Sequence, residues 1–500
     1  MRSFASFGRF AVLPLALACA GASADAIEPG LLARATQDGR ADALIVFGSS
    51  RLPLAPFDPR ADVRVRRRAE VAALRARADA EQAGVRAWLD ARGVAYRAYW
   101  IANLIQARLS ARELAALAAR TDVARIAANP RLPSRLPRPA VASAAADAPR
   151  SLAWGVERVG APAVWAAGDT GQGVVIGGED TGYQWDHPAL KTHYRGWNGT
   201  SAEHDRNWHD AIHDSSGNPC GNDAPAPCDD YGHGTHTAGT FVGDDGEGVQ
   251  IGVAPGARWI GCRNMDAGAG TPARYIECMQ WMLAPTDRDD RDPDPDLAPD
   301  VVSNSWTCSP GEGCTTGAEI EAAVDNLVAG GVFFVAAAAN DGPSCGSITA
   351  PPAIYAASFV VGATDDTDAL AMFSSRGPVA GDATIRPDAS APGVDVYSAW
   401  PPNDYRYLSG TSMATPHVAG VAALMIAANP GLKGHPDQVA AILRATAATA
   451  GVTDPWNSGC GGLTIADWPN DQVGYGRVDA GAAVRAALAA DVLFTDGFDD

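Results

Sequence analysis

Several motifs that mark common functional classes are missing from this chain. Its nine cysteines never occur as Cys-x-x-Cys, which argues against a zinc site. Gly171-Gln172-Gly173 precedes an apolar run instead of following one, and the full Gly-x-Gly-x-x-Gly pattern is absent, so a dinucleotide-binding fold is excluded. No segment recurs at a fixed period, which argues against a repeat architecture.

Lysine is also absent from residues 27–150, where 21 Arg outnumber 12 Asp and Glu and give a charge of +9. The whole chain carries −19 and residues 1–26 carry +1, which leaves −29 for residues 151–500. Strong acidity in the larger part argues against nucleic-acid binding. A basic block that precedes an acidic one predicts two parts that bind each other.

The N-terminus is typical of a secretory signal peptide, with a basic start, a short apolar middle and small residues up to Ala26. We expect cleavage after Ala24 or Ala26, so that residues 1–26 are removed. Lipid attachment at Cys19 is the alternative, disfavoured by the residue three places before it. No later apolar stretch predicts a membrane span. The protein should therefore be secreted, outside the cell or into the periplasm.

Loss of Cys19 leaves eight cysteines, all from Cys220 onward. An even number in an exported chain predicts four disulfides, although eight cysteines allow 105 pairings. The closely spaced residues Cys220 with Cys228 and Cys308 with Cys314 are expected to pair.

Residues 27–128 have the pattern of a small α+β unit. We expect, in order, a strand over 43–47, a helix over 64–92 closed by Gly93, two strands within 96–109, a helix after the capping-box residues Ser110 and Glu113, and a strand over 123–127. Residues 129–150 are rich in Pro, Ala, Ser and Arg, which predicts an exposed linker open to proteolysis.

After Ser151, short apolar runs alternate with helical or glycine-rich segments. The runs occupy 174–180, 257–260, 301–302, 331–339 and 359–361. This alternation predicts an α/β fold, with a mostly parallel sheet covered by helices on both faces. Reactive residues should then lie at the carboxyl ends of the strands. Residues 286–300 should form a surface loop. The sequence of the short acidic tail, residues 491–500, indicates no role for it.

Ser412 lies in Gly410-Thr411-Ser412, just before the apolar run 418–428. That run is too short to span a membrane and predicts a buried helix. At the start of such a helix, unpaired N–H groups and the dipole favour a developing oxyanion. A serine N-cap is the plain structural alternative. The surrounding Gly-Thr-Ser-Met-Ala is not Gly-x-Ser-x-Gly, which argues against a lipase-like hydrolase.

Two upstream motifs favour a catalytic Ser412. Asp180 ends an apolar run in Asp180-Thr181-Gly182, and His233 opens the block His-Gly-Thr-His-Thr-Ala-Gly. A serine alcohol needs a base with a pKa near neutrality, and a carboxylate fixes the tautomer of that imidazole. Taken singly, Asp180 would be a turn residue and His233 a helix cap, but the order Asp, His, Ser is a known triad order.

These three blocks resemble the active-site motifs of the subtilisin-like serine proteases (subtilases, peptidase S8 family), over about residues 151–485. Residues 300–306, 342–346 and 351–353 are most similar to the bacillopeptidase F-like branch. The resemblance implies a subtilisin-like catalytic domain over 151–490. It also implies that residues 27–150 form a ferredoxin-like inhibitory propeptide of the inhibitor I9 type, including the linker.

The resemblance makes Ser412 the nucleophile, His233 the general base and Asp180 its orienting carboxylate. Asn340 fits the family's oxyanion asparagine. Ala339 replaces the usual Gly, and it would be strained if the backbone there requires a positive φ.

By the same resemblance, Ser305, Trp306 and Thr307 should form the strand edge that pairs with an extended substrate. Ala338 should belong to the wall of the first specificity pocket. No acid is assigned to the floor of that pocket, so an apolar or aromatic preference is expected.

This chemistry requires no metal or cofactor. Structural calcium, common in related proteases, is an alternative role for the acids at 244–247 and 287–300. A solvated acidic loop is favoured, because no EF-hand pattern is present. His236 and His417 are expected to be packed and hydrogen-bonded, because the metalloprotease Glu is missing.

The predicted function is that of a secreted serine endopeptidase, a monomer with broad specificity for peptides and proteins. Residues 27–139 would block the active site and assist folding until the enzyme cuts itself between about 139 and 151. One alternative is a catalytically weak or inactive member that binds peptides. Another is a narrow processing protease, disfavoured because no room remains after residue 485 for an extra β domain.

Overall fold

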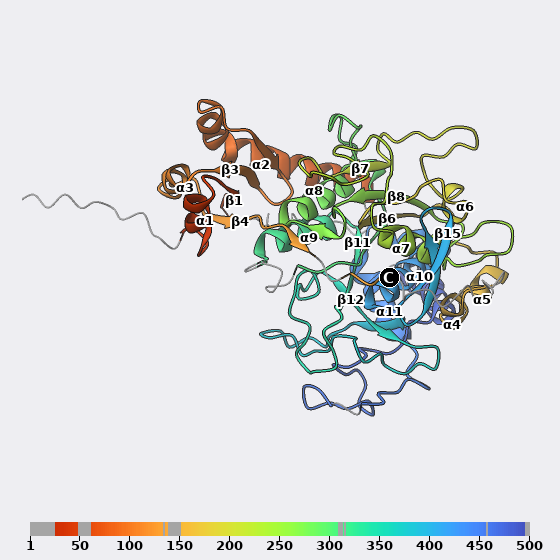
Figure 1. Cartoon of the computed structure of the whole chain (residues 1–500). Coiled ribbons are helices and arrows are strands. Elements are labelled where there is room, and N and C mark those ends of the chain that lie inside the picture. The colour runs from red at the N-terminus through yellow and green to blue at the C-terminus, as the bar shows by residue number, and fades with distance from the viewer. Residues whose placement is uncertain are drawn as a thin grey trace, which may run out of the picture.

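The computed structural model describes residues 26–48, 62–133, 136–138, 152–308, 314, 317–456 and 459–495 (Figure 1). The expected signal peptide up to Asp25, residues 139–151 of the expected linker and the last five residues lie outside this description.

An N-terminal unit contains, after one additional helix, the predicted order of elements. These are α1 (Leu31–Gln37), β1 (Ala41–Val46), α2 (Val63–Asp90), β2 (Tyr96–Tyr99), β3 (Leu104–Leu109), α3 (Ala111–Ala118) and β4 (Arg125–Ala128). The strands form an antiparallel sheet in the order β2-β3-β1-β4. The capping box of Ser110 and Glu113 is present at α3. The C-cap of α2 is Ala91 rather than Gly93, which follows in the left-handed region.

Helix α2 contributes to two hydrophobic cores. Val85 and Leu89 pack in the core of the N-terminal unit itself. Val71 and Leu74 pack in a second core that also contains Met279 of the main part of the chain, by which we mean the described residues from 152 to 495. The N-terminal unit therefore docks through buried apolar surface, beside α8 and α9 in Figure 1.

The main part of the chain is built on a seven-stranded parallel sheet in the order β13-β12-β11-β10-β6-β8-β7. Its strands are β6 (Val175–Asp180), β7 (Trp208–Asp210), β8 (Arg258–Arg263), β10 (Val301–Asn304), β11 (Phe333–Ala337), β12 (Phe359–Thr364) and β13 (Ala389–Pro392). The five predicted runs correspond to β6, β8, β10, β11 and β12. The α/β prediction is confirmed.

Helices cover both faces of this sheet. α7 (His233–Val242) and α10 (Thr411–Ala428) share one core, and α8 (Pro272–Leu283) and α9 (Ala318–Ala329) share the other. Among the described residues, α10 alone is long and apolar enough to cross a membrane, and 89% of it is buried inside the protein. It is therefore a core helix, and it begins earlier than the apolar run on which it was predicted.

The remaining elements are short or peripheral. They are α4 (Trp154–Arg158), α5 (Ala161–Ala166), α6 (Pro188–Lys191), α11 (Pro436–Thr446), α12 (Ala480–Thr495), the 3₁₀ helices η2 (Pro295–Leu297) and η4 (Pro430–Leu432), the antiparallel pair β14 (Val396–Trp400) and β15 (Asp404–Leu408), and the pair β5 (Leu132–Pro133) and β9 (Ala269–Gly270). Helix α12 extends to Thr495, into the segment expected to be an acidic tail.

Four disulfides link the described part of the chain. The predicted disulfides Cys220–Cys228 and Cys308–Cys314 are confirmed, and the other two are Cys262–Cys278 and Cys345–Cys460.

The prediction of an exposed linker over 129–150 is wrong at its start. Asn129 is buried and accepts a hydrogen bond from Ala273 N, and Leu132 pairs with Gly270. Backbone pairing with the main part, invisible in composition, fixes this segment.

Candidate active site

Asp180 and His233 form a buried pair where β6 ends and α7 begins. His233 Nδ1 lies 2.7 Å from Asp180 Oδ1, and both side chains are almost fully shielded from solvent. The same carboxylate oxygen accepts a 2.7 Å hydrogen bond from Thr181 N. Because a carboxylate only accepts, His233 carries its proton on Nδ1, and Nε2 keeps a free lone pair. That tautomer suits a general base.

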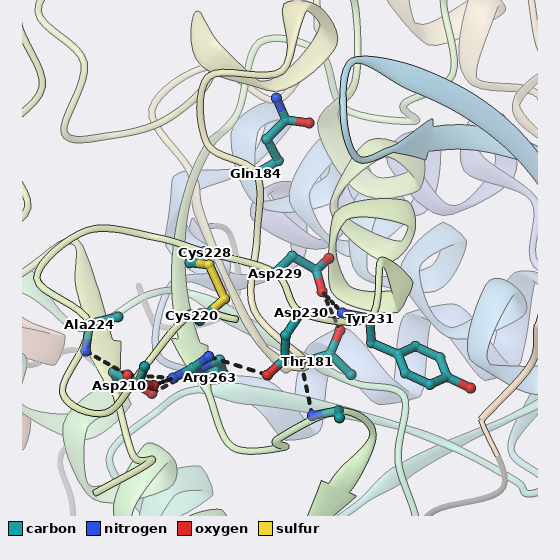
Figure 2. The surroundings of a disulfide bond; sticks show 12 residues. Thr181, Gln184, Asp210, Cys220, Ala224, Cys228, Asp229, Asp230, Tyr231 and Arg263 are labelled. Carbon is teal, nitrogen blue, oxygen red and sulfur yellow. Dashed lines mark hydrogen bonds and ion pairs between the residues drawn. A yellow bond between two sulfur atoms is a disulfide. The ribbon is translucent and has the colours of Figure 1, made fainter. Parts of the chain in front are cut away.

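Asp229, which the sequence analysis did not identify, organises the turn before His233. Its carboxylate accepts hydrogen bonds from the N–H groups of Tyr231, Gly232 and Thr235. It also accepts one from the hydroxyl of Thr181, next to Asp180. Figure 2 shows this cluster beside the Cys220–Cys228 disulfide. One carboxylate thus ties the end of β6 to the start of α7.

A glycine is required immediately after this strand end. Gly182 has φ 107°, and a Cβ there would come within 1.8 Å of the carbonyl oxygen of Cys228. Tyr183 N donates a 3.3 Å hydrogen bond to that same carbonyl. The close approach of two segments of the backbone therefore explains why glycine is the third residue of Asp180-Thr181-Gly182.

Ser412 is the second residue of α10, and the N-cap is Gly410. Its Oγ donates a 3.1 Å hydrogen bond to the carbonyl of Ser305, so it does not act as the serine N-cap considered above. His233 Nε2 is buried and, within the described ranges, has no hydrogen-bond partner. The serine–histidine bond is thus not formed; such bonds often form only when substrate is bound.

Asn340 lies beside the start of α10. Its Oδ1 accepts hydrogen bonds from Thr411 N at 2.9 Å and Thr411 Oγ1 at 3.0 Å. This anchoring leaves the amide Nδ2 as the group available to donate. Ala339 before it has φ 81°, a value at which an Ala side chain is strained. The strain expected if this position required a positive φ is therefore present.

The residues expected to bind substrate follow the carboxyl ends of β10 and β11. Ser305, Trp306 and Thr307 follow β10 and do not continue it as a strand. The Trp306 ring is buried and stacks on Tyr275, with ring centroids 3.9 Å apart. The Ala338 side chain packs in a small core with Ile348 and Val360. The assignment of these residues to substrate binding stays a prediction.

Two further histidines are packed, as expected. His236 Nε2 bonds the carbonyls of Val396 and Arg406, and burial, with a smaller effect of the neighbouring His233, lowers its pKa to about 3. His417 Nδ1 bonds the Met413 carbonyl, and burial lowers its pKa to about 4. Both imidazoles are therefore neutral at physiological pH.

The acids considered as calcium ligands instead accept hydrogen bonds from their own loops. Asp244 accepts from Gly246 N, Asp245 from Glu247 N and Val249 N, and Asp287 from Asp289 N and Arg291 N. Over the described ranges, no three His, Cys, Asp or Glu side chains form a metal-binding group.

Comparison with known proteins agrees with this geometry. Residues 171–476 match the subtilase family, peptidase S8. Bacillopeptidase F of Bacillus subtilis (strain 168) is 40% identical over 356 residues, covering 69% of this chain but only 23% of that protein. Subtilisin Savinase of Lederbergia lenta is 35% identical over 311 residues, covering 62% of this chain and 96% of that protein. With 306 residues matched around the Asp180–His233 pair and Ser412, this chain belongs to the subtilase family of serine proteases.

Proposed function

We propose that this chain is the self-processing precursor of a secreted serine endopeptidase that acts on peptides and proteins. The observation that supports this most strongly is the 2.7 Å contact of His233 Nδ1 with Asp180 Oδ1. It occurs in a chain that also places Ser412 at the start of α10, next to Asn340.

In the proposed reaction, Ser412 Oγ leaves the Ser305 carbonyl and attacks the substrate carbonyl, while His233 Nε2 takes its proton. Asp180 holds the ring and stabilises the imidazolium. The oxyanion accepts hydrogen bonds from Ser412 N–H and from Asn340 Nδ2. His233 then gives its proton to the leaving amine, and water hydrolyses the acyl-enzyme by the same steps in reverse.

We further propose that the N-terminal unit is an inhibitory propeptide. Its arginines and backbone contact the acidic main part at several places: Arg67 with the carbonyls of Ala298, Pro299 and Gly330, Arg68 with Asp296, Arg125 with Glu319, and Trp100 N and Ile101 N with Gln280. These contacts support the expectation that the +9 and −29 parts bind each other.

The segment that follows the N-terminal unit approaches the candidate site. Tyr231, two residues before His233, donates a 3.4 Å hydrogen bond to the Leu136 carbonyl. A Cβ on Gly410, two residues before Ser412, would lie 2.7 Å from Pro137 Cγ. Occupancy of this position by the chain itself supports inhibition before processing.

The test of the proposed activity is labelling with a fluorophosphonate probe, with casein hydrolysis followed in parallel. We expect the label on Ser412 and loss of hydrolysis in proportion to labelling. A Ser412→Ala variant should bind no probe and remain a full-length precursor after export. Absence of both label and hydrolysis, once residues 27–150 have been removed, would favour a peptide-binding protein without catalysis.

A further inference from the structure

Leu132 and Pro133, which follow the N-terminal unit, form the short strand β5 on the main part. Leu132 pairs with Gly270 and Pro133 with Ala269, in antiparallel register. Further along, Pro137 lies against Gly410, two residues before Ser412. Because an added strand is how extended peptides bind to a sheet edge, this segment occupies the path of a substrate.

Arg131 directly precedes this strand and forms an ion pair with the main part. Its Nη2 donates to Oδ2 of Asp266 at 2.8 Å. The Asp266 side chain is 1% exposed and the Arg131 side chain 55% exposed. The carboxylate is therefore fixed beneath the strand, while the arginine reaches down to it from the surface.

The position of Asp266 is determined by the same turn that builds strand β9. Asp266 and Ala269 exchange backbone hydrogen bonds of 2.8 and 2.9 Å. The hydroxyl of Ser215 donates to Asp266 Oδ2. These contacts belong to the main part alone. Departure of the N-terminal unit removes Arg131 and the strand β5, and leaves the Asp266 carboxylate with its contacts to Ser215 and Ala269.

We propose that Asp266 is a specificity-determining residue of the mature enzyme, which accepts an arginine or lysine side chain of the substrate. The preferred basic residue stands one position before the substrate residue that pairs with Gly270. This inference rests on the proposed protease function and makes its specificity less broad. The charge of −29 on residues 151–500 favours the same substrates, because it attracts basic polypeptides.

The test uses protein expressed as the full chain and normalised to the sites labelled by a fluorophosphonate. Two peptides of residues 129–138 compete with labelled casein, one natural and one with citrulline in place of Arg131. Citrulline keeps the shape and removes the charge. The natural peptide should compete about three- to tenfold better, a range between an exposed ion pair and a charge-assisted hydrogen bond.

The variant Asp266→Asn should abolish this preference, and 0.5 M salt should reduce it in the unmodified enzyme. Asp296→Asn is the matched control, because Asp296 pairs with Arg68, outside the peptide, and should leave the preference unchanged. If Asp266→Asn fails to fold, the comparison of the two peptides on the unmodified enzyme still tests whether the charge of Arg131 is recognised. Equal competition by both peptides would overturn the subsite alone. Absence of hydrolysis dependent on Ser412 would overturn the proposed function and the subsite with it.

Discussion

Tyr99 of the N-terminal unit donates a 2.8 Å hydrogen bond to Oε2 of Glu277, a carboxylate buried in the main part. The other oxygen of Glu277 contacts His209 Nε2 at 3.0 Å and His213 Nε2 at 2.7 Å. Burial alone would raise the pKa of Glu277, but the His213 charge and the two histidine hydrogen bonds hold it well below its usual range. Tyr99 thus donates to an ionised acceptor at the interface.

Tyr99→Phe should weaken the docking of the N-terminal unit. Hydrogen bonds to charged groups contribute about 1.5–3 kcal/mol, and the substitution removes one without changing the ring. The urea midpoint of unfolding, measured in the uncleaved Ser412→Ala precursor, should fall accordingly. Tyr96→Phe on the same strand is the control, because the Tyr96 hydroxyl interacts with Asp90 of the N-terminal unit itself. Equal losses in both variants would contradict a specific role for the Tyr99–Glu277 bond.

The same cluster predicts a pH dependence of stability. Burial opposes the charge on His213, but the Glu277 charge and the hydrogen bonds to Glu277 and Asp223 raise its pKa. The stabilisation is therefore fully present below the ordinary histidine pKa of about 6.5, and it is lost as pH rises through the raised pKa. Glu277, with a lowered pKa, contributes above about 4.5 and loses its contribution as pH falls. Stability of the precursor should be greatest between these limits.

His213→Gln should lower the urea midpoint near pH 6 and flatten its decline toward alkaline pH. His204→Gln is a control of opposite sign, because burial and the Arg288 charge lower the pKa of His204. That substitution should improve stability only on the acidic side of about pH 6.5. An unchanged alkaline decline in His213→Gln would show that other groups cause it.

Ala339→Gly should stabilise the enzyme. Ala339 has φ 81°, and glycine adopts this backbone without its Cβ clashing. We expect a gain of about 1 kcal/mol in the free energy of unfolding, at the low end of the strain at such positions. The rate of thermal inactivation should fall. Ala338→Gly, at a buried position without a positive φ, should instead destabilise, and a gain in both variants would contradict the strain argument.

Asn340→Ala should reduce kcat by about 10²–10³ with little change in KM, the loss found in subtilisin itself when its oxyanion asparagine is removed. Steady-state hydrolysis of a peptide substrate measures both constants. Thr411→Val is the control, because it removes the hydroxyl that bonds Asn340 Oδ1 at 3.0 Å and leaves the amide in place. A comparable loss of kcat in the control would assign the effect to loop structure.

The sequence predicted those elements whose apolar residues repeat, such as α2 and the strand that ends at Asp180. It did not predict β7, which reads Trp-His-Asp, or β13, which reads Ala-Ser-Ala-Pro, because their pairing comes from neighbouring strands rather than from their composition.

The functional residues were likewise predicted where a local motif contains them, and not where they depend on a contact with a distant part of the chain. Local motifs contained Asp180, His233 and Ser412. The role of Glu277, by contrast, depends on its hydrogen bond with Tyr99, which is 178 residues away in the sequence. Arg67 was not singled out within the helix predicted over 64–92. Its guanidinium is buried and donates to the Gly330 carbonyl at the end of α9. Such contacts depend on tertiary docking, which no local pattern encodes.

Glu179, the residue before Asp180, combines full burial with an absence of hydrogen bonds. Neither of its carboxylate oxygens has a partner in the described part of the chain. Burial raises its pKa well above the usual range. It is paired in register with Asn304, whose Oδ1 also lacks a partner within the described ranges. The carboxyl group is therefore neutral in the folded protein over a range of pH in which an unfolded chain ionises it.

Glu179→Gln should therefore raise stability at alkaline pH and not at acid pH. Because the folded pKa is raised, the unmodified protein loses stability as pH increases from about 4.5 toward that pKa, and a glutamine does not ionise. At pH 8 we expect a gain of about 1–3 kcal/mol, the scale of an unsatisfied buried polar group, and no gain at pH 4. Urea unfolding of the Ser412→Ala precursor measures both, with exposed Glu157→Gln as control. A gain of equal size at both pH values would mean that packing, rather than ionisation, limits stability beside Asp180.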